Sequence, residues 1–419
     1  MASTGRRLRS GYTTGACAAA AAKAAVMLLL YPEDRNVGNA SVEIPFPDGS
    51  RVTFTAYLHG VTREPSGSAA LASVVKDGGD DPDVTNGAEI SASARIATGV
   101  EAQGDFVVIR GGSGVGRVTK PGLSVSVGEP AITAIPRSMI RQAVHEALSG
   151  DGGLAGDRRI DFRGQVRGNL SSKHGELGTR LRVREAPAAL LVEGATGYPL
   201  AVVPAIEITI SVLKGEELAK KTLNTRLGIV GGISILGTSG IVRPLSSEAW
   251  TSTITASMDV AQASGIDRIV LSVGRVSERA HMKRYAFAEE AYVMMGDYFE
   301  FSLTDARRHG FKRIHISAQW AKMLKISMST PQTHARHGTI DTRKGAEHLN
   351  GLGIAITRDR DFNTAREIYD YLVATYGFSL PMFRKICVAA KRYAEGITAG
   401  IPVIAHLVSY EGTILVDSE

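Results

Sequence analysis

The sequence predicts an α+β domain over residues 1–224 and then an α/β domain over residues 225–419, with an open, mostly parallel, Rossmann-like sheet. Two observations lead to this prediction. Before residue 225, short alternating apolar runs are separated by turn residues such as Asn86 and Gly87, which is typical of antiparallel strands. After it, nearly continuous apolar runs alternate with segments of helical periodicity, which indicates parallel βαβ units.

The first domain is expected to begin with an alanine-rich helix over residues 16–30, capped by Thr13 or Thr14. Apolar residues at helical spacing predict a second helix over residues 137–148, and a short third helix is predicted over residues 215–221. The alternating runs predict strands over residues 41–46, 51–57, 89–96, 106–110, 123–127 and 206–213.

In the second domain, the apolar runs predict strands over residues 227–235, 268–273, 291–295, 313–317, 403–408 and 413–416. Helices are predicted over residues 246–264, 278–288, 298–309, 319–328, 343–350, 362–376 and 380–395. Ligands of open parallel sheets bind at the carboxyl ends of the strands, so the loops that follow these strands are candidates for ligand contacts.

Composition narrows the class of protein. The chain has 419 residues, of which 44% are hydrophobic and 21% are charged, as in folded globular proteins. A net charge of +6 is mild for this length and suits an anionic small ligand better than nucleic acid. Two cysteines, Cys17 and Cys387, are too few for a disulfide framework, which favours the cytoplasm. The alanine-rich helix contains Lys23 and falls short of the ~20 apolar residues that span a bilayer, so no membrane contact is predicted.

The strongest local feature is the glycine-rich segment, residues 227–242, which lies just before a predicted helix. Its glycines would let backbone amides approach a ligand closely, and Thr238 and Ser239 offer hydroxyl groups. Its spacing matches neither the dinucleotide nor the P-loop fingerprint. Ligand contact is slightly favoured over the alternative, a turn whose glycines are needed for tight packing.

A second glycine-rich loop, residues 110–117, is basic. Gly111 and Gly116 have P-loop spacing, but Arg117 and Val118 replace the required Lys and Ser/Thr, which argues against a nucleotide-dependent kinase. Arg110, Arg117 and Lys120 could donate hydrogen bonds to a ligand rich in carboxylates. A solvated hairpin is an equally weighted alternative.

The acidic loop, residues 77–83, contains Asp77, Asp80, Asp81 and Asp83. A calcium loop is not favoured, because Asn86 and Ala92 occupy the positions of its glycine and its bidentate glutamate. Crowding of like charges should raise the pKa of at least one carboxyl, which would suit a general base or an orienting carboxylate. The alternative is an ordinary polar turn.

Four histidines and one cysteine are candidates for metal ligands or nucleophiles. His334 and His337 lack the partners and spacing of zinc motifs, so hydrogen-bonded or solvated histidines are favoured for them and for His315 and His348. Cys17 lies near the start of the alanine-rich helix, where a thiolate could be stabilised, but inert packing is favoured.

Taken together and in this order, these segments resemble the CbiD family, the cobalt-precorrin-5B (carbon-1)-methyltransferases of cobalamin biosynthesis. The resemblance is dense over residues 9–148 and 206–260 and looser to about residue 350. Relative to the family, residues 149–203 look like an insertion. The matching stretches are Gly11–Cys17, residues 76–87 and 110–123, Gly128–Ile132 with Pro136 and Arg137, and the glycine-rich segment.

The resemblance implies an enzyme that uses S-adenosylmethionine to methylate carbon 1 of cobalt-precorrin-5B, giving cobalt-precorrin-6A in the anaerobic, cobalt-early route. It implies no protein-bound metal, because the cobalt belongs to the tetrapyrrole substrate. A protein that binds a corrinoid intermediate without turnover is the alternative, and a homodimer is considered for either function.

The resemblance also suggests where the two reactants bind. The methyl donor is expected at the turn of the glycine-rich segment, on Gly231, Gly232, Gly237, Thr238, Ser239 and Gly240. The tetrapyrrole is expected to face Thr13, Thr14, Asp80, Arg110, Arg117 and Lys120. The candidates for catalytic proton transfer are Asp81, Asp83 and Lys23.

Overall fold

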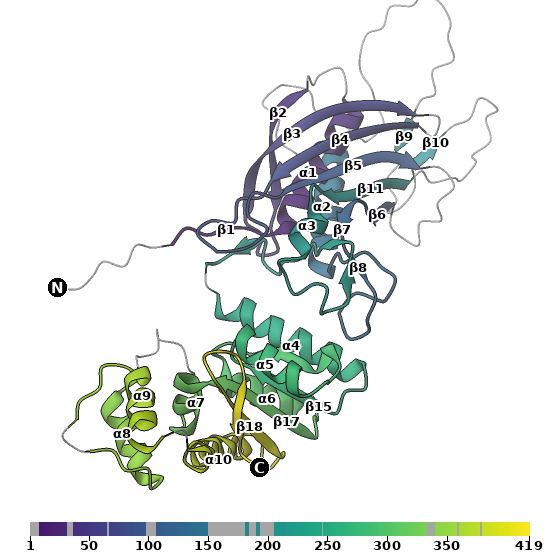
Figure 1. The fold of residues 1–419 in the computed structure, drawn as a ribbon. Coiled ribbons are helices and arrows are strands. Elements are labelled where there is room, and N and C mark those ends of the chain that lie inside the picture. Colours follow the sequence, from purple (N-terminus) through teal and green to yellow (C-terminus); the bar gives the residue numbers. More distant parts are fainter. Residues whose placement is uncertain are drawn as a thin grey trace, which may run out of the picture. The chain divides into compact units, whose positions relative to one another are not determined.

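The computed structural model describes residues 8–31, 37–64, 67–97, 106–149, 181–183, 190–192, 205–244, 246–332, 340–357, 360–377 and 379–419. Its contacts divide the chain into two units, of which the first ends at Ser246 and the second begins at Ser247; residues 120–123 belong to the second (Figure 1). The sequence predicted a boundary at residue 225. The structure instead assigns the glycine-rich segment to the first unit, because its short strands pair with strands of that unit.

The first unit contains a six-stranded sheet in the order β2-β3-β4-β5-β11-β6, in which all pairs are antiparallel except β11 with β6 (Figure 1). Its strands are β2 (Gly38–Pro45), β3 (Arg51–Glu64), β4 (Gly67–Val75), β5 (Glu89–Ala97), β6 (Val107–Gly111) and β11 (Ala205–Val212). Strand β4 was not predicted. The strand predicted over residues 123–127 is wrong, since those residues form bends and a turn.

The alanine-rich helix α1 (Thr14–Leu30) has Thr13, one of the two predicted candidates, as its N-cap. Every residue from Thr14 to Leu28 is buried, because the helix contacts both the sheet and helix α2 (Ala134–Ser149). Alanine suits this position because its small side chain lets neighbouring elements approach the helix closely. Helix α3 (Gly215–Ala219) follows β11.

Short strands connect the loops of the first unit. They are β1 (Gly11–Tyr12) with β14 (Ile241–Val242), β7 (Gly114–Val115) with β13 (Gly232–Ile233), and β8 (Arg117–Val118) with β12 (Ile229–Val230). Within the predicted insertion, the described residues form a two-stranded hairpin, β9 (Leu181–Val183) with β10 (Leu190–Val192); residues 150–180, 184–189 and 193–203 lie outside the described residues.

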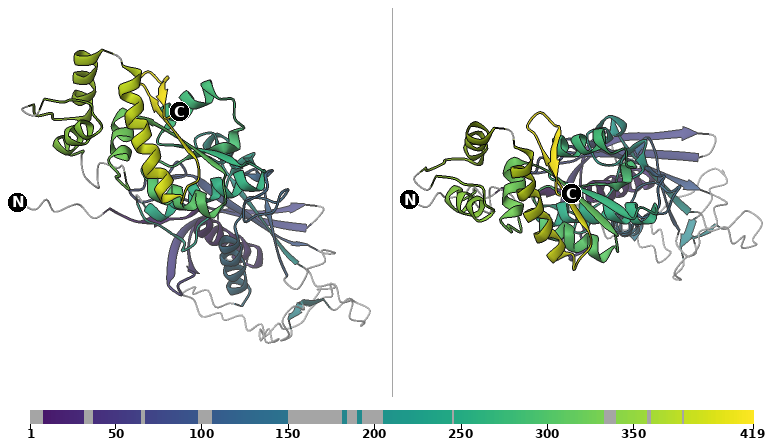
Figure 2. Two further views of the ribbon diagram at one scale, coloured as in Figure 1. Left: turned by 90° about the horizontal axis from the view of Figure 1, so that it is seen from below. Right: turned by 60° about the horizontal axis from the view of Figure 1, so that its bottom comes forward.

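The second unit contains a five-stranded sheet in the order β16-β15-β17-β18-β19. The second unit is coloured green to yellow in Figure 2. The first four strands are mutually parallel and β19 is antiparallel to β18, so the sheet is mostly parallel, as predicted. The strands are β15 (Arg268–Ser272), β16 (Tyr292–Met294), β17 (Arg313–Gln319), β18 (Val403–Val408) and β19 (Ile414–Asp417).

The two faces of this sheet differ in character. One face carries a large apolar core made with helices α4 (Ser247–Ala263), α6 (Phe299–Arg308), α7 (Trp320–Ser327), α8 (Thr342–Gly351), α9 (Ala365–Tyr376) and α10 (Leu380–Ile397). The other face lies against α5 (Arg275–Arg284) and carries buried polar side chains, among them Ser272, His315, Ser317 and His406. A short 3-10 helix, η1 (Glu289–Ala291), precedes β16. No described helix combines the length and apolar character needed to cross a membrane.

Candidate functional site

Three segments that are distant in the sequence meet at the start of α1. The backbone N–H of Tyr12 donates to the carbonyl of Asp77 at 2.7 Å, in the acidic loop. The N–H of Thr13 donates to the carbonyl of Gly240 at 2.9 Å, in the glycine-rich segment. The structure therefore brings together the acidic loop, the glycine-rich segment and Gly11–Cys17.

The acidic loop is held against the chain just before α1. The guanidinium of Arg9 forms a two-pronged ion pair with the carboxylate of Asp77, and the backbone N–H of Arg9 donates to Oδ2 of Asp80 at 2.7 Å. A Cβ added to Gly11 or Gly79 would lie within 2.3 Å of opposing backbone atoms, so only glycine permits this close approach. Arg9 and the N–H of Gly79 lower the pKa of Asp77.

The carboxylate of Asp83 is hydrogen-bonded to residues on either side of the acidic loop. Its carboxylate accepts from the Lys76 ammonium at 2.8 Å and from the N–H and hydroxyl of Thr85 at 2.8 and 2.7 Å. Burial acts to raise the pKa of Asp83, but these hydrogen bonds outweigh it and the net shift is downward. For Asp77 and Asp83 the shift is thus opposite to the one expected from crowding, because each carboxylate faces a cation.

Thr14 fastens the glycine-rich segment to the start of α1. Its buried hydroxyl accepts from the N–H of Leu236 at 2.9 Å and lies 3.2 Å from the carbonyl oxygens of Ser234 and Leu236, to which it can donate. The N–H of Gly15 donates to the carbonyl of Leu236 at 3.1 Å, and Oγ1 of Thr13 accepts from the N–H of Ala16. Amides of the first helical turn are therefore already bonded within the chain.

Packing accounts for three of the predicted donor-binding glycines. A Cβ on Gly232 would lie 2.1 Å from the carbonyl oxygen of Gly114, one on Gly237 would lie 2.5 Å from the Thr13 side chain, and one on Gly240 would lie 2.8 Å from the Phe46 ring. By contrast, a Cβ on Gly231 would meet nothing within 4 Å, and the side chains of Thr238 and Ser239 are exposed. At three of the six positions predicted to bind the methyl donor, close packing is therefore enough to explain why the residue is glycine.

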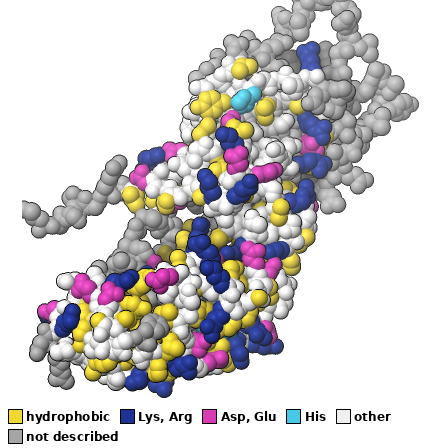
Figure 3. All heavy atoms as spheres, in the orientation of Figure 1, with side chains coloured by type: hydrophobic (Ala, Val, Ile, Leu, Met, Phe, Trp, Pro, Cys, Tyr) yellow, Lys and Arg dark blue, Asp and Glu magenta, His cyan; other side chains and the backbone are white. Residues whose placement is uncertain are grey.

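The predicted basic residues bond to other parts of the chain than the start of α1. Glu207 accepts from Nε of Arg110 at 2.6 Å and from Arg95, and although burial alone would raise the pKa of Glu207, the two arginines lower it. Arg117 donates to the carbonyl of Gly128. Lys120, which belongs to the second unit, pairs with Glu290 at 2.8 Å. On the face drawn in Figure 3, Lys and Arg side chains are interspersed with Asp and Glu side chains.

Lys23 is a buried structural cation. Its ammonium donates to Oε2 of Glu146 at 2.6 Å and to the carbonyl of Glu43 at 2.8 Å, and only 1% of its side chain is exposed. Arg51 forms a second pair with Glu146. Lys23 therefore joins α1 to α2 and β2, and its described contacts do not include the acidic loop.

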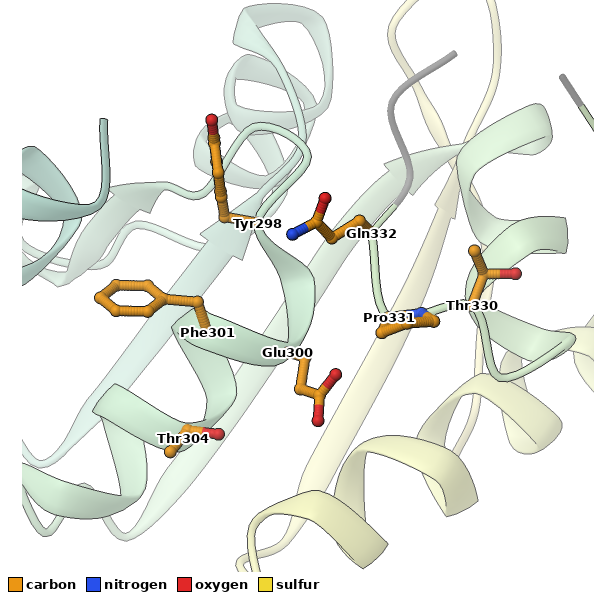
Figure 4. A pocket seen from close by; sticks show the side chains of 7 residues that line it. All are labelled: Tyr298, Glu300, Phe301, Thr304, Thr330, Pro331 and Gln332. Carbon is orange, nitrogen blue, oxygen red and sulfur yellow. The ribbon is translucent and has the colours of Figure 1, made fainter. Parts of the chain in front are cut away.

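The second unit offers a separate candidate at the carboxyl ends of its strands. After β15 the chain continues through Gly274, the extended N-cap of α5, which has no side-chain cap. After β16 it continues through Asp297, which forms an ion pair with Lys322 of α7. A hollow of about 630 Å³ adjoins this loop (Figure 4). Its lining residues come from the start of α6 and from the loop after α7: Tyr298, Glu300, Phe301, Thr304, Thr330, Pro331 and Gln332.

Two residues that the sequence does not single out, His281 and His406, lie with His315 beneath α5. His315 meets His281 and His406, and their ring nitrogens lie within 4.8 Å of one another. No local spacing announces this cluster, although a histidine within an apolar strand is a usable signal. His334 and His337 lie outside the described residues, and His348 bonds the hydroxyl of Ser327. Cys17 is fully buried, and burial raises the pKa of its thiol to about 12, in agreement with inert packing.

Comparison with known proteins identifies the family. A family model described as CbiD matches residues 1–161 and 183–244, which is more than half of the chain. The chain belongs to the CbiD family. The gap between the two parts of this CbiD match, residues 162–182, lies inside the predicted insertion.

CbiD relatives match nearly the whole chain. A protein of Desulfotalea psychrophila named cobalt-precorrin-5B C(1)-methyltransferase is 42% identical over 96% of both chains. One of Geobacter metallireducens with the same name is 40% identical over 97% of this chain and 98% of its own. A crystal structure of cobalamin biosynthesis protein (CbiD) from Archaeoglobus fulgidus covers 76% of this chain and 79% of its own, with 24% identity and a TM-score of 0.32.

Proposed function

We propose that this chain transfers a methyl group from S-adenosylmethionine to carbon 1 of cobalt-precorrin-5B, giving cobalt-precorrin-6A in the cobalt-early route. The observation that carries the proposal is the 42% identity, over 96% of both chains, to a protein named for this reaction. The convergence of the acidic loop, the glycine-rich segment and Gly11–Cys17 supports it, because these are the segments that resemble the family.

Methyl transfer from a sulfonium to a ring carbon chiefly requires alignment of the two reactants. Correct positioning can contribute roughly 7–11 kcal/mol to the lowering of the barrier. The substrate carries many acetate and propionate groups, for which guanidinium groups are well-matched partners. Arg110 fits this role, since 55% of its side chain remains exposed while Glu207 holds its Nε–H.

We place the tetrapyrrole on the first unit, facing the acidic loop and the start of α1. Among the predicted proton-transfer residues, Asp83 forms an ion pair with Lys76, and Lys23 forms one with Glu146. These ion pairs favour structural roles for Asp83 and Lys23. Asp81 is partly exposed and remains the candidate for proton transfer. Asp80 is exposed and remains a candidate for orienting the substrate.

For the methyl donor, we propose the carboxyl edge of the Rossmann-like sheet of the second unit, in preference to the glycine-rich segment. The strand order corresponds to 2-1-3-4-5, in which the connections reverse direction between β15 and β17. Ligands of such sheets bind at this reversal. Gly274 lies there with an open Cβ position and an uncapped α5 behind it. The exposed Gly231, Thr238 and Ser239 are the second candidate.

Incubation with isotopically labelled S-adenosylmethionine and cobalt-precorrin-5B tests the activity. We expect the product to gain the mass of one methyl group at carbon 1. Substrate binding without any mass gain would instead support a corrinoid-binding protein that performs no turnover.

Calorimetric titration with S-adenosylhomocysteine tests the donor site. Gly274→Val should fold, because its backbone is extended and a Cβ there meets nothing within 4 Å, but it should weaken binding about tenfold or more by occupying the space beside the strand edge. Thr238→Val, an exposed change that removes a hydroxyl of the second candidate but keeps the size of the side chain, should bind as the wild type does. The reverse result would return the donor to the glycine-rich segment.

The remaining parts of the proposal concern location and partners. We propose a cytoplasmic enzyme whose partner is its small-molecule substrate, without nucleic acid or membrane. The two cysteines are free and buried, which suits a reducing compartment. A homodimer stays a prediction, which sedimentation of the purified chain would test.

A further inference from the structure

Three buried histidines converge between α5 and the sheet of the second unit. Nε2 of His281 lies 3.2 Å from Nδ1 of His315, which lies 3.0 Å from Nε2 of His406. His281 and His406 are fully buried, and His315 is 4% exposed.

The fold itself creates this meeting. His315 lies opposite Ile404, and His406 lies opposite Ser317, so the two histidines are two positions apart on neighbouring strands and share one face. Helix α5 is held over that face, where the hydroxyl of Ser317 donates to the carbonyl of Ser277 at 2.8 Å. His281 is one turn further along α5 and therefore reaches the same place.

Hydrogen bonding assigns the proton of His281. The hydroxyl of Tyr292 donates to the carbonyl of Tyr285 at 2.9 Å, so its oxygen can only accept from Nδ1 of His281, 3.2 Å away. Nδ1 therefore carries the ring proton, and Nε2 presents a lone pair to His315.

No placement of the ring protons of His315 and His406 satisfies the hydrogen bonding of all three rings. A proton on Nδ1 of His315 faces two acceptors, His281 and His406, and can make a linear bond with only one of them. A proton on Nδ1 of His406 would also be unsatisfied, because this buried atom has no hydrogen-bond partner among the described residues. Moving the proton to Nε2 of His406 would make Nδ1 of His315 an acceptor, whose lone pair then faces that of His281.

The three rings are almost completely buried, and burial disfavours the charged form of an imidazole, so each ring offers a lone pair. Tyr285 and Phe287 flank His281, with ring centroids 4.6 and 5.4 Å from its own. Neutral imidazoles in such closed surroundings are suitable ligands for a borderline-soft cation.

We propose that His281, His315 and His406 form a three-histidine site for a divalent transition-metal ion of the zinc class. Two of the three nitrogen separations, 3.0 and 3.2 Å, are close to the roughly 3.3–3.4 Å between ligands that lie 2.0–2.1 Å from a tetrahedral ion, and the third, between His281 and His406, is within 4.8 Å. The bond of His281 to Tyr292 is the outer-shell contact that orients such a ligand. The ion would fasten α5, whose N-cap is Gly274, to β17 and β18.

This site was not expected from the sequence, which predicted no protein-bound metal. The histidines are 34 and 91 residues apart, so no spacing motif connects them. The inference does not depend on the proposed methyl transfer, and its test requires neither the tetrapyrrole nor the methyl donor.

Cobalt(II) titration of the chelator-treated full chain tests the site, with Co²⁺ as the probe. We expect saturation at one ion per chain and the intense visible absorption of four-coordinate Co²⁺, which Zn²⁺ should abolish. His406→Gln should weaken Co²⁺ binding by roughly 100-fold or more. His348→Gln, which removes a half-buried histidine of the same unit outside the cluster, should bind as the wild type does.

The wild-type measurement decides the proposal even where a variant folds poorly. Absence of a saturable one-ion signal in the wild type would overturn the site. Equal loss of binding in His406→Gln and His348→Gln, with circular dichroism spectra like that of the wild type, would also overturn it. Zn²⁺ should raise the melting temperature of the wild type and leave that of His406→Gln unchanged.

Discussion

The loops around Thr13 and the region under α5 both contain buried polar side chains, but the polar groups of the two regions are matched differently. Around Thr13, Lys76 faces Asp83, Arg9 faces Asp77, and the hydroxyl of Thr14 contacts the glycine-rich segment. Under α5, three neutral rings converge and Nδ1 of His406 lacks a partner among the described residues. The first region is complete within the chain, so its motif residues contribute stability, whereas the second is complete only with a ligand.

The largest expected effect comes from breaking the match at the acidic loop. Lys76→Met should lower the free energy of unfolding of the first unit by about 3 kcal/mol, because it leaves Asp83 partly buried without its cation. Differential scanning calorimetry is the appropriate measurement. Tryptophan fluorescence would report on the second unit, because both tryptophans, Trp250 and Trp320, belong to it.

Lys344→Met is the matched control. This lysine is 74% exposed and its pair with Asp341 spans 3.8 Å, so its loss should change stability by no more than about 0.5 kcal/mol. If the two variants were equally stable, the Lys76–Asp83 pair would not be structural, and Asp83 would again be a candidate for proton transfer.

Substitutions at two adjacent glycines, Gly231 and Gly232, distinguish a packing role of the glycine-rich segment from a ligand-binding role. Gly232→Ala should cost about 2–3 kcal/mol, because its Cβ would lie 2.1 Å from the carbonyl oxygen of Gly114 and the backbone would have to shift. Gly231→Ala should cost about 1 kcal/mol, since its φ of +86° strains alanine but the space is open. Thermal unfolding gives both values. Equal stability of the two variants, with a shared loss of donor binding, would make the segment a ligand site.

A smaller effect is expected at Thr14. Thr14→Val keeps the shape but removes the hydroxyl that bonds to Leu236, and should cost about 1–2 kcal/mol by leaving the partly buried N–H of Leu236 unpaired. Thr14→Ser keeps the hydroxyl and should recover most of this loss in the same calorimetric measurement. A Thr14→Val chain as stable as the wild type would show that water or another group replaces the bond.

Much of the fold follows from local pattern. The alanine-rich run and Thr13 predict α1 and its cap, and the apolar runs predict each strand of the second unit's five-stranded sheet. Strand β4 escaped prediction because alanine and serine fill most of it and hide the alternation. Residues 123–127 alternate but form bends and a turn, because alternation alone supplies no partner strand.

The candidate sites were less predictable, because they depend on tertiary partners. Asp77 and Asp83 have lowered pKa values where crowding predicted a raised one, since Arg9 and Lys76 face them only in the folded chain. The histidine cluster depends on the register of β17 and β18 and on the position of α5, neither of which any local spacing encodes.

The smallest expected effect is that of lowering the pH from 7 to 5 on the melting temperature of the first unit. Asp83, Glu146 and Glu207 each have a folded-state pKa below the ordinary value, because cations outweigh the effect of burial. Such groups stabilise the folded state above their unfolded pKa of about 4, and this contribution is lost as the pH falls through the folded pKa. The first unit should therefore melt at the same temperature at pH 7 and pH 5 and at lower temperatures below about pH 4.

Lys76→Met provides the comparison for this pH series. Without the ammonium, the pKa of Asp83 should return toward its ordinary value, so the variant should lose less additional stability in acid than the wild type. Calorimetry of both chains from pH 7 to pH 3 measures this difference. A rise in the melting temperature of the first unit from pH 7 to pH 5 would contradict the matched-charge description, since it is the result expected from the raised carboxyl that crowding alone predicts. Such a carboxyl would bind its proton in the folded state in that range and stabilise the folded state as the pH falls.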